Sequence, residues 1–177
     1  MSNSKYHFFL SGPFSQWYKS NMTCTHGLLW NCCEQFMMAS KAVTFNDERA
    51  FNKICDASDP ADQKRLGRDV KNYNEEVWAK KRLDVVFMGN MLKFTQNETL
   101  KKMILSTEDK ILVECNPRDK IWGIGLSIAD AYQVTEKEWK GKNYLGKVLM
   151  LVRECIATNN VYLDRSVYDI FCERGWL

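Results

Sequence analysis

EEVWAKKRLDVVFMGNMLKFT, residues 75–95, is the stretch that decides the fold class, because its apolar side chains recur with the period of an α-helix. They fall into two stripes, one of Leu83, Phe87, Met91 and Phe94 and another of Trp78, Val85, Met88 and Leu92. A helix that is apolar on two sides is buried in the centre of a fold. The segment therefore predicts a long central helix.

A second helix is predicted on the N-terminal side of this segment, from about Cys32 to Phe45. Asn31 can cap its first turn, and Glu34 follows at the position that closes a capping box. A third helix is expected over residues 60–66.

The third helix carries start and stop signals of its own. Ser58 or Asp59 can cap it, Pro60 suits its first turn, and Gly67 can end it. These features predict a short helix just before the central one.

The other segments have weaker patterns. We expect short extended pieces in 6–30, a helix in 100–105, a strand in 110–115, a helix in 145–156 and, in the tail 162–177, at most one more helix. Since no Pro/Gly/Ser-rich linker divides the chain, the sequence predicts one compact, mainly helical domain over residues 1–177, with a few short strands.

The composition argues against several classes of protein. A net charge of +3 is too small to indicate nucleic-acid binding by itself. Seven Cys without a CxxC pair and only two His argue against a zinc site and a disulfide framework. The apolar runs are too short for a signal peptide or a membrane span. We therefore expect a cytoplasmic protein with no metal, no cofactor and no membrane attachment.

Two charged residues of the predicted helix 32–45 form the first candidate site. Glu34 and Lys41 are seven positions apart, close to two turns, so both project from one face, roughly 10 Å apart along the axis. Met37, Met38 and Phe45 share that face, and charges in such surroundings are costly to bury unless they are paired or used. The two side chains could converge on a ligand. Alternatively, Glu34 only caps the helix and Lys41 only extends to solvent.

The loop VECNPRDKIWGIG, residues 113–125, is the second candidate site. It gathers Glu114, Arg118, Asp119 and Trp122 around a turn with two glycines, Gly123 and Gly125, at the end of a predicted strand, where binding loops are common. A tight turn anchored by a buried Trp122 is the alternative interpretation.

Three further residues allow both a structural and a functional interpretation. Arg68 could bind a phosphate or carboxylate with both its guanidinium nitrogens, or could be a surface residue at a helix end. Trp78 could stack on a base or ribose, or belong to the core. Asn143 could contact a ligand or cap the following helix. These residues alone do not identify a reaction.

Six blocks in order do resemble a known family. They are PFSQWYKS (13–20), CEQFMMASKA (33–42), DPADQKRLGRDV (59–70), GNMLKFTQN (89–97), LVECNPRDKIWGIGL (112–126) and GKNYLGKVLMLVRE (141–154). Their order and spacing are similar to those of the YbiA/NADAR family over about residues 8–156, in the branch with EQ(Y/F)MM in its first helix. Gln35 stands where other members have His. The tail 157–177 is a C-terminal extension without a counterpart.

The resemblance implies a compact, mainly helical fold and metal-independent cleavage of N-glycosidic bonds. The substrates of the family are phosphoribosylamino-pyrimidine intermediates of riboflavin synthesis, or ADP-ribose on guanine in nucleic acid, so ADP-ribosylated DNA is a candidate partner. The resemblance implies catalytic roles for Glu34, Lys41 and Asp119. It implies a functional role for Trp78 and ligand contacts for Arg68 and Asn143. Trp122 and Gly123 of the candidate loop complete the predicted ligand-binding residues.

Both substrate classes attach ribose C1 to an exocyclic amine, which permits two mechanisms. Lys41 could form a Schiff base with the opened sugar while Glu34 or Asp119 transfers protons. Alternatively, two carboxylates could support direct attack by water. A non-catalytic module that binds ADP-ribose or a nucleotide is the main alternative to an enzyme, and a purely structural helical protein is a third interpretation.

Overall fold

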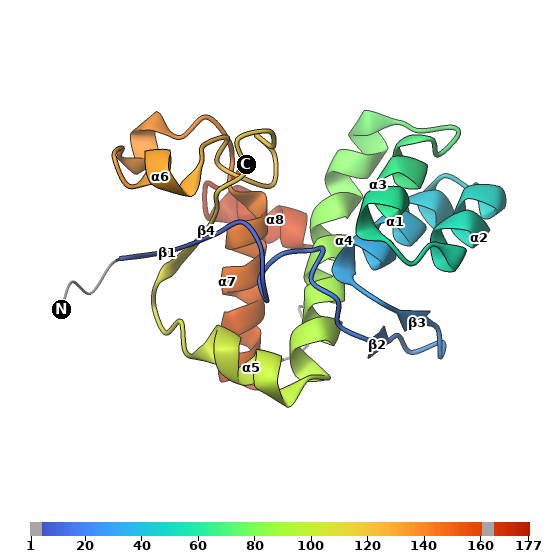
Figure 1. Cartoon of the computed structure of the whole chain (residues 1–177), viewed down its shortest axis with the longest axis horizontal. Coiled ribbons are helices and arrows are strands. Elements are labelled where there is room, and N and C mark those ends of the chain that lie inside the picture. The colour runs from blue at the N-terminus through green and yellow to red at the C-terminus, as the bar shows by residue number, and fades with distance from the viewer. Residues whose placement is uncertain (1–4, 161–164) are drawn as a thin grey trace. The chain divides into compact units, whose positions relative to one another are not determined.

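A computed structural model describes residues 5–160 and 165–177 of the chain, and these residues are mainly helical with a few short strands (Figure 1). Their contacts divide the chain into two compact units. Residues 16–98 form the α4 unit, named after helix α4 (Glu75–Thr95), and the residues before 16 and after 98 form the α7 unit, named after helix α7 (Tyr144–Ala157). The helical content confirms the predicted fold class. The prediction of one domain over residues 1–177 stays a prediction.

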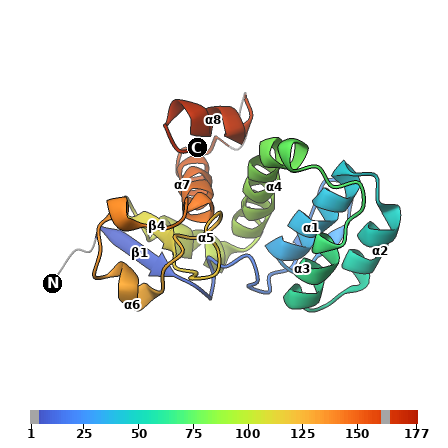
Figure 2. The same cartoon turned by 90° about the horizontal axis from the view of Figure 1, so that it is seen from above.

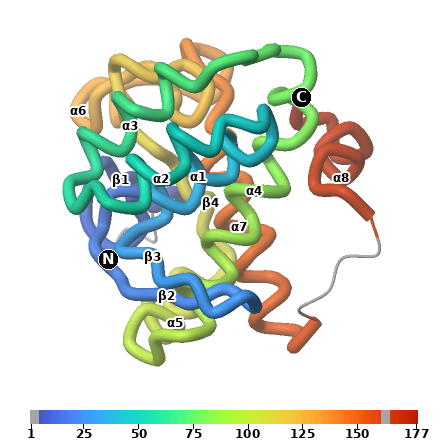
Figure 3. The backbone as a smooth tube through the Cα atoms, turned by 90° about the vertical axis from the view of Figure 1, so that its right-hand side faces the viewer, coloured from blue at the N-terminus to red at the C-terminus, as the bar shows by residue number. Residues whose placement is uncertain are grey.

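The α4 unit is a group of four helices with a small hairpin. Its elements are β2 (Met22–Thr23), β3 (Leu29–Trp30), α1 (Cys33–Thr44), α2 (Glu48–Asp56), α3 (Pro60–Arg68) and α4 (Glu75–Thr95). Helix α1 packs against each of the other three helices, which lie around it in Figures 2 and 3. Strands β2 and β3 pair antiparallel. Helix α1 is therefore the centre of this unit.

Helix α4 has the bounds that the sequence predicts. It begins after Asn74, whose side-chain oxygen accepts a hydrogen bond from the Val77 N–H at 3.0 Å. The four residues of its first apolar stripe are buried. The prediction that the second stripe is also buried is wrong in part, because Met88 is 52% exposed and Val85 and Leu92 are only half-buried.

The predicted capping box of α1 is wrong. Cys32 occupies the N-cap position, and its side chain makes no capping hydrogen bond. The side chain that reaches back is Gln35, whose Oε1 accepts the Asn31 N–H at 2.9 Å. Glu34 is 5% exposed and instead lies in the interior. The interpretation of Glu34 as only a helix cap is therefore also wrong.

Helix α3 starts as predicted but ends later. Asp59 accepts the Ala61 N–H at 2.8 Å, and Pro60 is the first helical residue. Gly67 does not end the helix, which continues to Arg68. Gly67 is needed for close packing, because a Cβ there would lie 2.0 Å from Met38 Sδ of α1.

The α7 unit contains the remaining elements. They are β1 (Tyr6–Phe9), most of α5 (Glu98–Leu105), β4 (Ile111–Glu114), α6 (Ile128–Ala131), the 3-10 turn η1 (Glu136–Glu138), α7 (Tyr144–Ala157) and α8 (Val167–Glu173). Strands β1 and β4 pair in parallel, with Phe8 opposite Val113, and appear together in Figure 2. Val113 belongs to a buried cluster with Cys115, Ile124 and Leu126.

The weaker predictions for this part of the chain are confirmed, since a helix, a strand and a second helix lie at about 100–105, 110–115 and 145–156. The tail contains α8, while residues 161–164, where the tail was expected to begin, lie outside the described residues. Most of the cysteines are buried, and all seven are free thiols. Among the described helices, none has the length and apolarity needed to cross a bilayer.

Candidate active site

Helix α1 carries the two residues that the sequence singles out first. Glu34 lies in its first turn and is buried, with its backbone N–H donating to the Gln16 carbonyl at 3.0 Å. Lys41 lies about two turns further along and is half-buried. The helix thus holds a buried carboxyl group and a partly buried amine.

The Lys41 amine is held by residues of its own unit. Its Nζ donates a hydrogen bond to the Gly67 carbonyl of α3 at 2.7 Å. It also lies 4.2 Å from the centroid of the Tyr73 ring, a distance at which a cation and an aromatic face attract. The interpretation that Lys41 only extends into solvent is therefore wrong.

The surroundings of Lys41 favour its neutral form. Burial lowers the pKa of the Lys41 amine, the charge of Glu75 raises it and the charge of Arg68 lowers it, and the resulting pKa lies below the ordinary value for lysine. Only the neutral amine has the lone pair that a nucleophile needs. The direction of this change in pKa is the one that makes an amine more available as a nucleophile.

Tyr73, Glu75 and Arg82, which were not among the predicted site residues, form a group of contacts beside Lys41. The Tyr73 hydroxyl donates to the Glu75 carboxylate, and Arg82 Nη1 pairs with Glu75 Oε1 at 3.1 Å. Burial, together with the hydrogen bond to Glu75, raises the pKa of Tyr73 to about 12, so the phenol keeps its proton. Since Tyr73 lies 32 positions after Lys41 in a polar loop, no local sequence pattern links the two.

Arg68 and Trp78 are the other candidate residues of the α4 unit. Arg68 is the last residue of α3 and is exposed, and its charge acts on Lys41. Trp78 is 5% exposed, which favours the interpretation as a core residue. Their roles as ligand contacts stay predictions.

A second buried lysine, Lys93 of α4, was missed by the sequence analysis. It is 1% exposed, and its Nζ lies 5.4 Å from the ring centroid of Tyr18. Burial lowers the pKa of Lys93, while the nearby thiols of Cys33 and Cys32 raise it, and the pKa ends below the ordinary value. The sequence signal for its burial was its position next to Phe94, which belongs to the first apolar stripe of the helix.

Asp119 organises the candidate loop of the α7 unit. Its Oδ1 accepts the N–H groups of Ile121 at 2.9 Å and Trp122 at 2.8 Å. Trp122 is half-buried, and its ring packs edge-to-face with the Tyr144 ring, with the two ring centroids 6.4 Å apart. One oxygen of Asp119 therefore shapes the turn.

Gly123 and Asn143 connect this loop to β4. A Cβ at Gly123 would lie 2.9 Å from the Glu114 carbonyl oxygen, so no larger residue fits there without a shift. The Gly123 carbonyl accepts the Asn143 N–H at 3.2 Å. Asn143 Oδ1 accepts the Glu114 N–H at 3.0 Å, and its Nδ2 donates to the Leu112 carbonyl at 2.9 Å. Asn143 is 2% exposed.

The prediction that Asn143 is the N-cap of the following helix is confirmed, although its side chain makes no capping hydrogen bond. Asn143 does occupy the N-cap position of α7, but its side chain bonds to β4 instead. Backbone carbonyls replace the side-chain cap, since Ile121 and Trp122 accept the N–H groups of Tyr144 and Leu145 at 3.2 and 3.1 Å.

The structure thus gathers the candidate residues in two groups. Glu34, Lys41, Arg68 and Trp78 belong to the α4 unit, and Asp119, Trp122, Gly123 and Asn143 belong to the α7 unit. Within residues 5–160 and 165–177, no three His, Cys, Asp or Glu side chains come together in a way that could hold a metal ion. The catalytic and binding roles of all eight residues stay predictions.

These features define an α-rich protein with a short parallel strand pair and a helix that carries both a glutamate and a lysine. The sequence pattern of the NADAR domain matches residues 7–157, so the chain belongs to the NADAR family. The match includes residues of both units and ends where the C-terminal extension was predicted to begin.

Several named proteins, one of them with a solved structure, are similar to this chain over most of its length. N-glycosidase R617 of Acanthamoeba polyphaga mimivirus is 46% identical over 145 residues, which are 80% of this chain and 85% of that protein. Riboflavin biosynthesis protein VVA0006 of Vibrio vulnificus is 32% identical over 85% of this chain and 37% of its own length. The NMR structure of Escherichia coli YbiA has a TM-score of 0.72 and 28% identity, covering 90% of this chain and 89% of that one. The predicted YbiA-like fold is confirmed.

Proposed function

We propose that the chain is an N-glycosidase that hydrolyses the bond between ribose C1 and an amino-substituted base. The observation that carries the proposal is the partly buried Lys41 amine, with its lowered pKa, on the same helix as the buried Glu34. Membership of the NADAR family and similarity to a protein named N-glycosidase support the same activity.

Two substrate classes fit this activity. One is a phosphoribosylamino-pyrimidine of riboflavin synthesis, which the similarity to a riboflavin biosynthesis protein supports. The other is ADP-ribose attached to guanine in a nucleotide or in DNA. Both contain phosphate, for which the exposed Arg68 guanidinium near Lys41 is the proposed contact.

In the proposed mechanism, Lys41 forms a covalent bond to the sugar. The bond between C1 and the ring oxygen breaks, that oxygen takes a proton, and the base nitrogen forms an imine with C1. Lys41 Nζ adds to C1, and the base amine leaves with a proton, so that C1 is now an imine of Lys41. Water then adds to C1 and releases both the sugar and the free amine.

Glu34 is the proton-transfer group that we assign to these steps, and Asp119 is the alternative. The Gly67 carbonyl, which accepts from Nζ at 2.7 Å, orients the amine. A mechanism with two carboxylates and direct attack by water would use Lys41 only for binding. No step of either mechanism uses a metal, so the activity should persist in EDTA.

Two incubations test the proposal. The purified chain is mixed with DNA that carries ADP-ribosylated guanine and, separately, with the phosphoribosylamino-pyrimidine, and the released base is measured by chromatography. Release from either substrate that is lost in both Glu34→Gln and Lys41→Ala supports the proposal, provided that circular dichroism shows both variants folded. Binding of ADP-ribose without any release would instead identify a non-catalytic module.

A further inference from the structure

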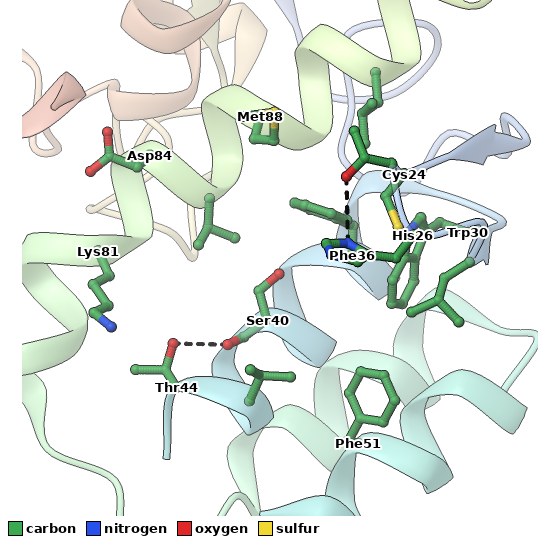
Figure 4. Close-up of a pocket in the computed structure, with 15 residues that line it drawn as sticks. Cys24, His26, Trp30, Phe36, Ser40, Thr44, Phe51, Lys81, Asp84 and Met88 are labelled. Atoms are coloured by element: carbon green, nitrogen blue, oxygen red, sulfur yellow. Dashed lines mark hydrogen bonds between the residues drawn. The ribbon is translucent and has the colours of Figure 1, made fainter. Parts of the chain in front are cut away.

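A pocket of about 580 Å³ lies within the α4 unit, between the β2–β3 hairpin and the helices α1, α2 and α4 (Figure 4). Its volume is within the range of small-molecule sites. None of the eight candidate active-site residues lines it. Helix α1 contributes Phe36 and Ser40 to this pocket, whereas Glu34 and Lys41 lie elsewhere on that helix. The pocket is therefore separate from the proposed catalytic residues.

The walls of the pocket suit a flat, apolar ligand. Trp30 packs edge-to-face with Phe36 at 5.5 Å and with Phe51 at 6.4 Å between ring centroids. The opposite wall is the second apolar stripe of α4, including Val85 and the 52% exposed Met88. Val85, Met88 and Leu92 of that stripe line the pocket and are half-buried or exposed, so a ligand in the pocket would cover them. Aromatic and thioether groups of this kind favour contact with another aromatic ring.

The hairpin places a cysteine in the wall of this pocket. Cys24 begins the loop between β2 and β3, and its backbone is fixed because its N–H donates to the Leu28 carbonyl and its own carbonyl accepts the Gly27 N–H, at 3.1 and 2.9 Å. The hairpin is in turn bound to α4, where the Gln96 side chain exchanges two hydrogen bonds with the Thr23 backbone at 2.8 and 2.7 Å. Figure 4 shows Cys24 beside His26 and Trp30.

Several N–H groups act on the Cys24 sulfur. Burial raises the pKa of the thiol, but the backbone N–H groups of His26 and Leu28, the Trp30 indole and the N–H of Cys24 itself lower it by more, so the pKa ends below its ordinary value. The indole is 5% exposed, and apart from this sulfur no described residue is placed to accept a hydrogen bond from its Nε1. A buried donor without an acceptor is costly, and a negative charge on the neighbouring sulfur would reduce that cost.

We propose that this pocket is a second ligand site, that it binds small aromatic α,β-unsaturated carbonyl compounds, and that Cys24 is the residue that captures them. The sulfur bonds to the β-carbon of the ligand, the electrons of the C=C bond move to the carbonyl oxygen, and the α-carbon then takes a proton from water. Neither an oxidant nor a reductant is needed. Lys81, Asp84 and His26 are the charged or titratable side chains that line the pocket besides Cys24.

Two maleimides with the same reactive double bond test this proposal on the full chain. N-phenylmaleimide carries an aromatic ring and N-ethylmaleimide does not. The rate of labelling of each cysteine is followed by peptide mass spectrometry, with the exposed Cys172 as the internal control. Cys24 should react before Cys172 and should prefer the phenyl probe by about 2- to 10-fold, the size expected of an aromatic contact. Equal preference at both cysteines would overturn the proposal.

A matched pair of variants tests the role of the pocket itself. Met88→Trp places a large side chain in the pocket and should remove the phenyl preference at Cys24. Met103→Trp makes the same change at another exposed helix position, outside the pocket lining, and should leave the phenyl preference at Cys24 intact. Identical labelling in both variants would contradict a ligand site here. Since labelling requires no glycosidase turnover, this result and the outcome of the base-release assay are independent.

Discussion

The contact between Lys41 and Tyr73 leads to a quantitative prediction. Lys41 Nζ lies 4.2 Å from the ring centroid, and Tyr73 is 43% exposed. At this exposure a cation–π contact stabilises the charged amine by about 0.5–1 kcal/mol. Tyr73→Leu removes that contribution, so the ratio of neutral to protonated Lys41 should rise about 2- to 5-fold at a given pH.

The direction in which Tyr73→Leu moves the pH profile depends on which protonation state of Lys41 reacts. In the proposed mechanism the neutral amine attacks, so kcat/KM rises with pH as Lys41 loses its proton. Because Tyr73→Leu destabilises the protonated form, it further lowers the pKa of Lys41 and moves this rise to lower pH. Tyr73→Phe keeps the ring and loses only the hydrogen bond to Glu75, so it is the matched control. Its profile should stay near that of the unmodified chain.

To test the role of the Tyr73 ring, base release is measured across pH for the unmodified chain, Tyr73→Leu and Tyr73→Phe. A poorer position of the amine in Tyr73→Leu would lower the plateau, whereas a change in pKa moves the midpoint, so the two effects are separable. A midpoint that does not move in Tyr73→Leu, or that moves equally in Tyr73→Phe, would refute the assigned role of the ring.

Three further predictions concern the same unit. Borohydride added during turnover should trap the sugar on the peptide that contains Lys41, and substantial turnover by Lys41→Arg, which keeps the charge but cannot form the imine, would exclude the Schiff base. Arg68→Lys should raise KM several-fold for a phosphorylated substrate and much less for its dephosphorylated form; equal effects would indicate a structural role. Gly67→Ala, with its Cβ 2.0 Å from Met38 Sδ, should lower the free energy of unfolding by about 1–3 kcal/mol in urea titrations, and more than the control Gly89→Ala, whose Cβ meets the Phe36 ring at 2.9 Å.

The reliability of the sequence predictions depended on how local their causes are. Helix α4 was predicted with its observed bounds, because a long segment of apolar residues with helical period is a local signal. Helix α2 (Glu48–Asp56) was missed although Phe51, Ile54 and Cys55 recur at helical spacing, because the helix has only nine residues and Ile54 is the only one of them that is fully buried. Its cap, Asp47, was the remaining signal, since it accepts the Ala50 N–H at 3.0 Å.

In the candidate site, too, local sequence patterns predicted some features, whereas others depend on tertiary packing. Helical spacing placed Glu34 and Lys41 on one helix, and this much is a local property of the sequence. The partners of Lys41, Gly67 and Tyr73, are 26 and 32 positions further on, and only tertiary packing brings them to its amine. The pKa of Lys41 depends on its burial and on the opposing charges of Glu75 and Arg68, and these could not be derived without the fold.

The two hydrogen bonds from Asn143 to β4 have a consequence for aggregation. Strand β4 pairs with β1 on one side, and its other edge would present the Leu112 carbonyl and the Glu114 N–H to any passing strand. The Asn143 amide occupies both groups, at 2.9 and 3.0 Å, and so imitates the backbone of a neighbouring strand. Unprotected strand edges recruit further chains into intermolecular sheets. The Asn143 side chain, together with the Ile124 N–H that donates to the Glu114 carbonyl at 2.9 Å, thus ends this sheet at two strands and leaves these backbone groups unavailable to a further chain.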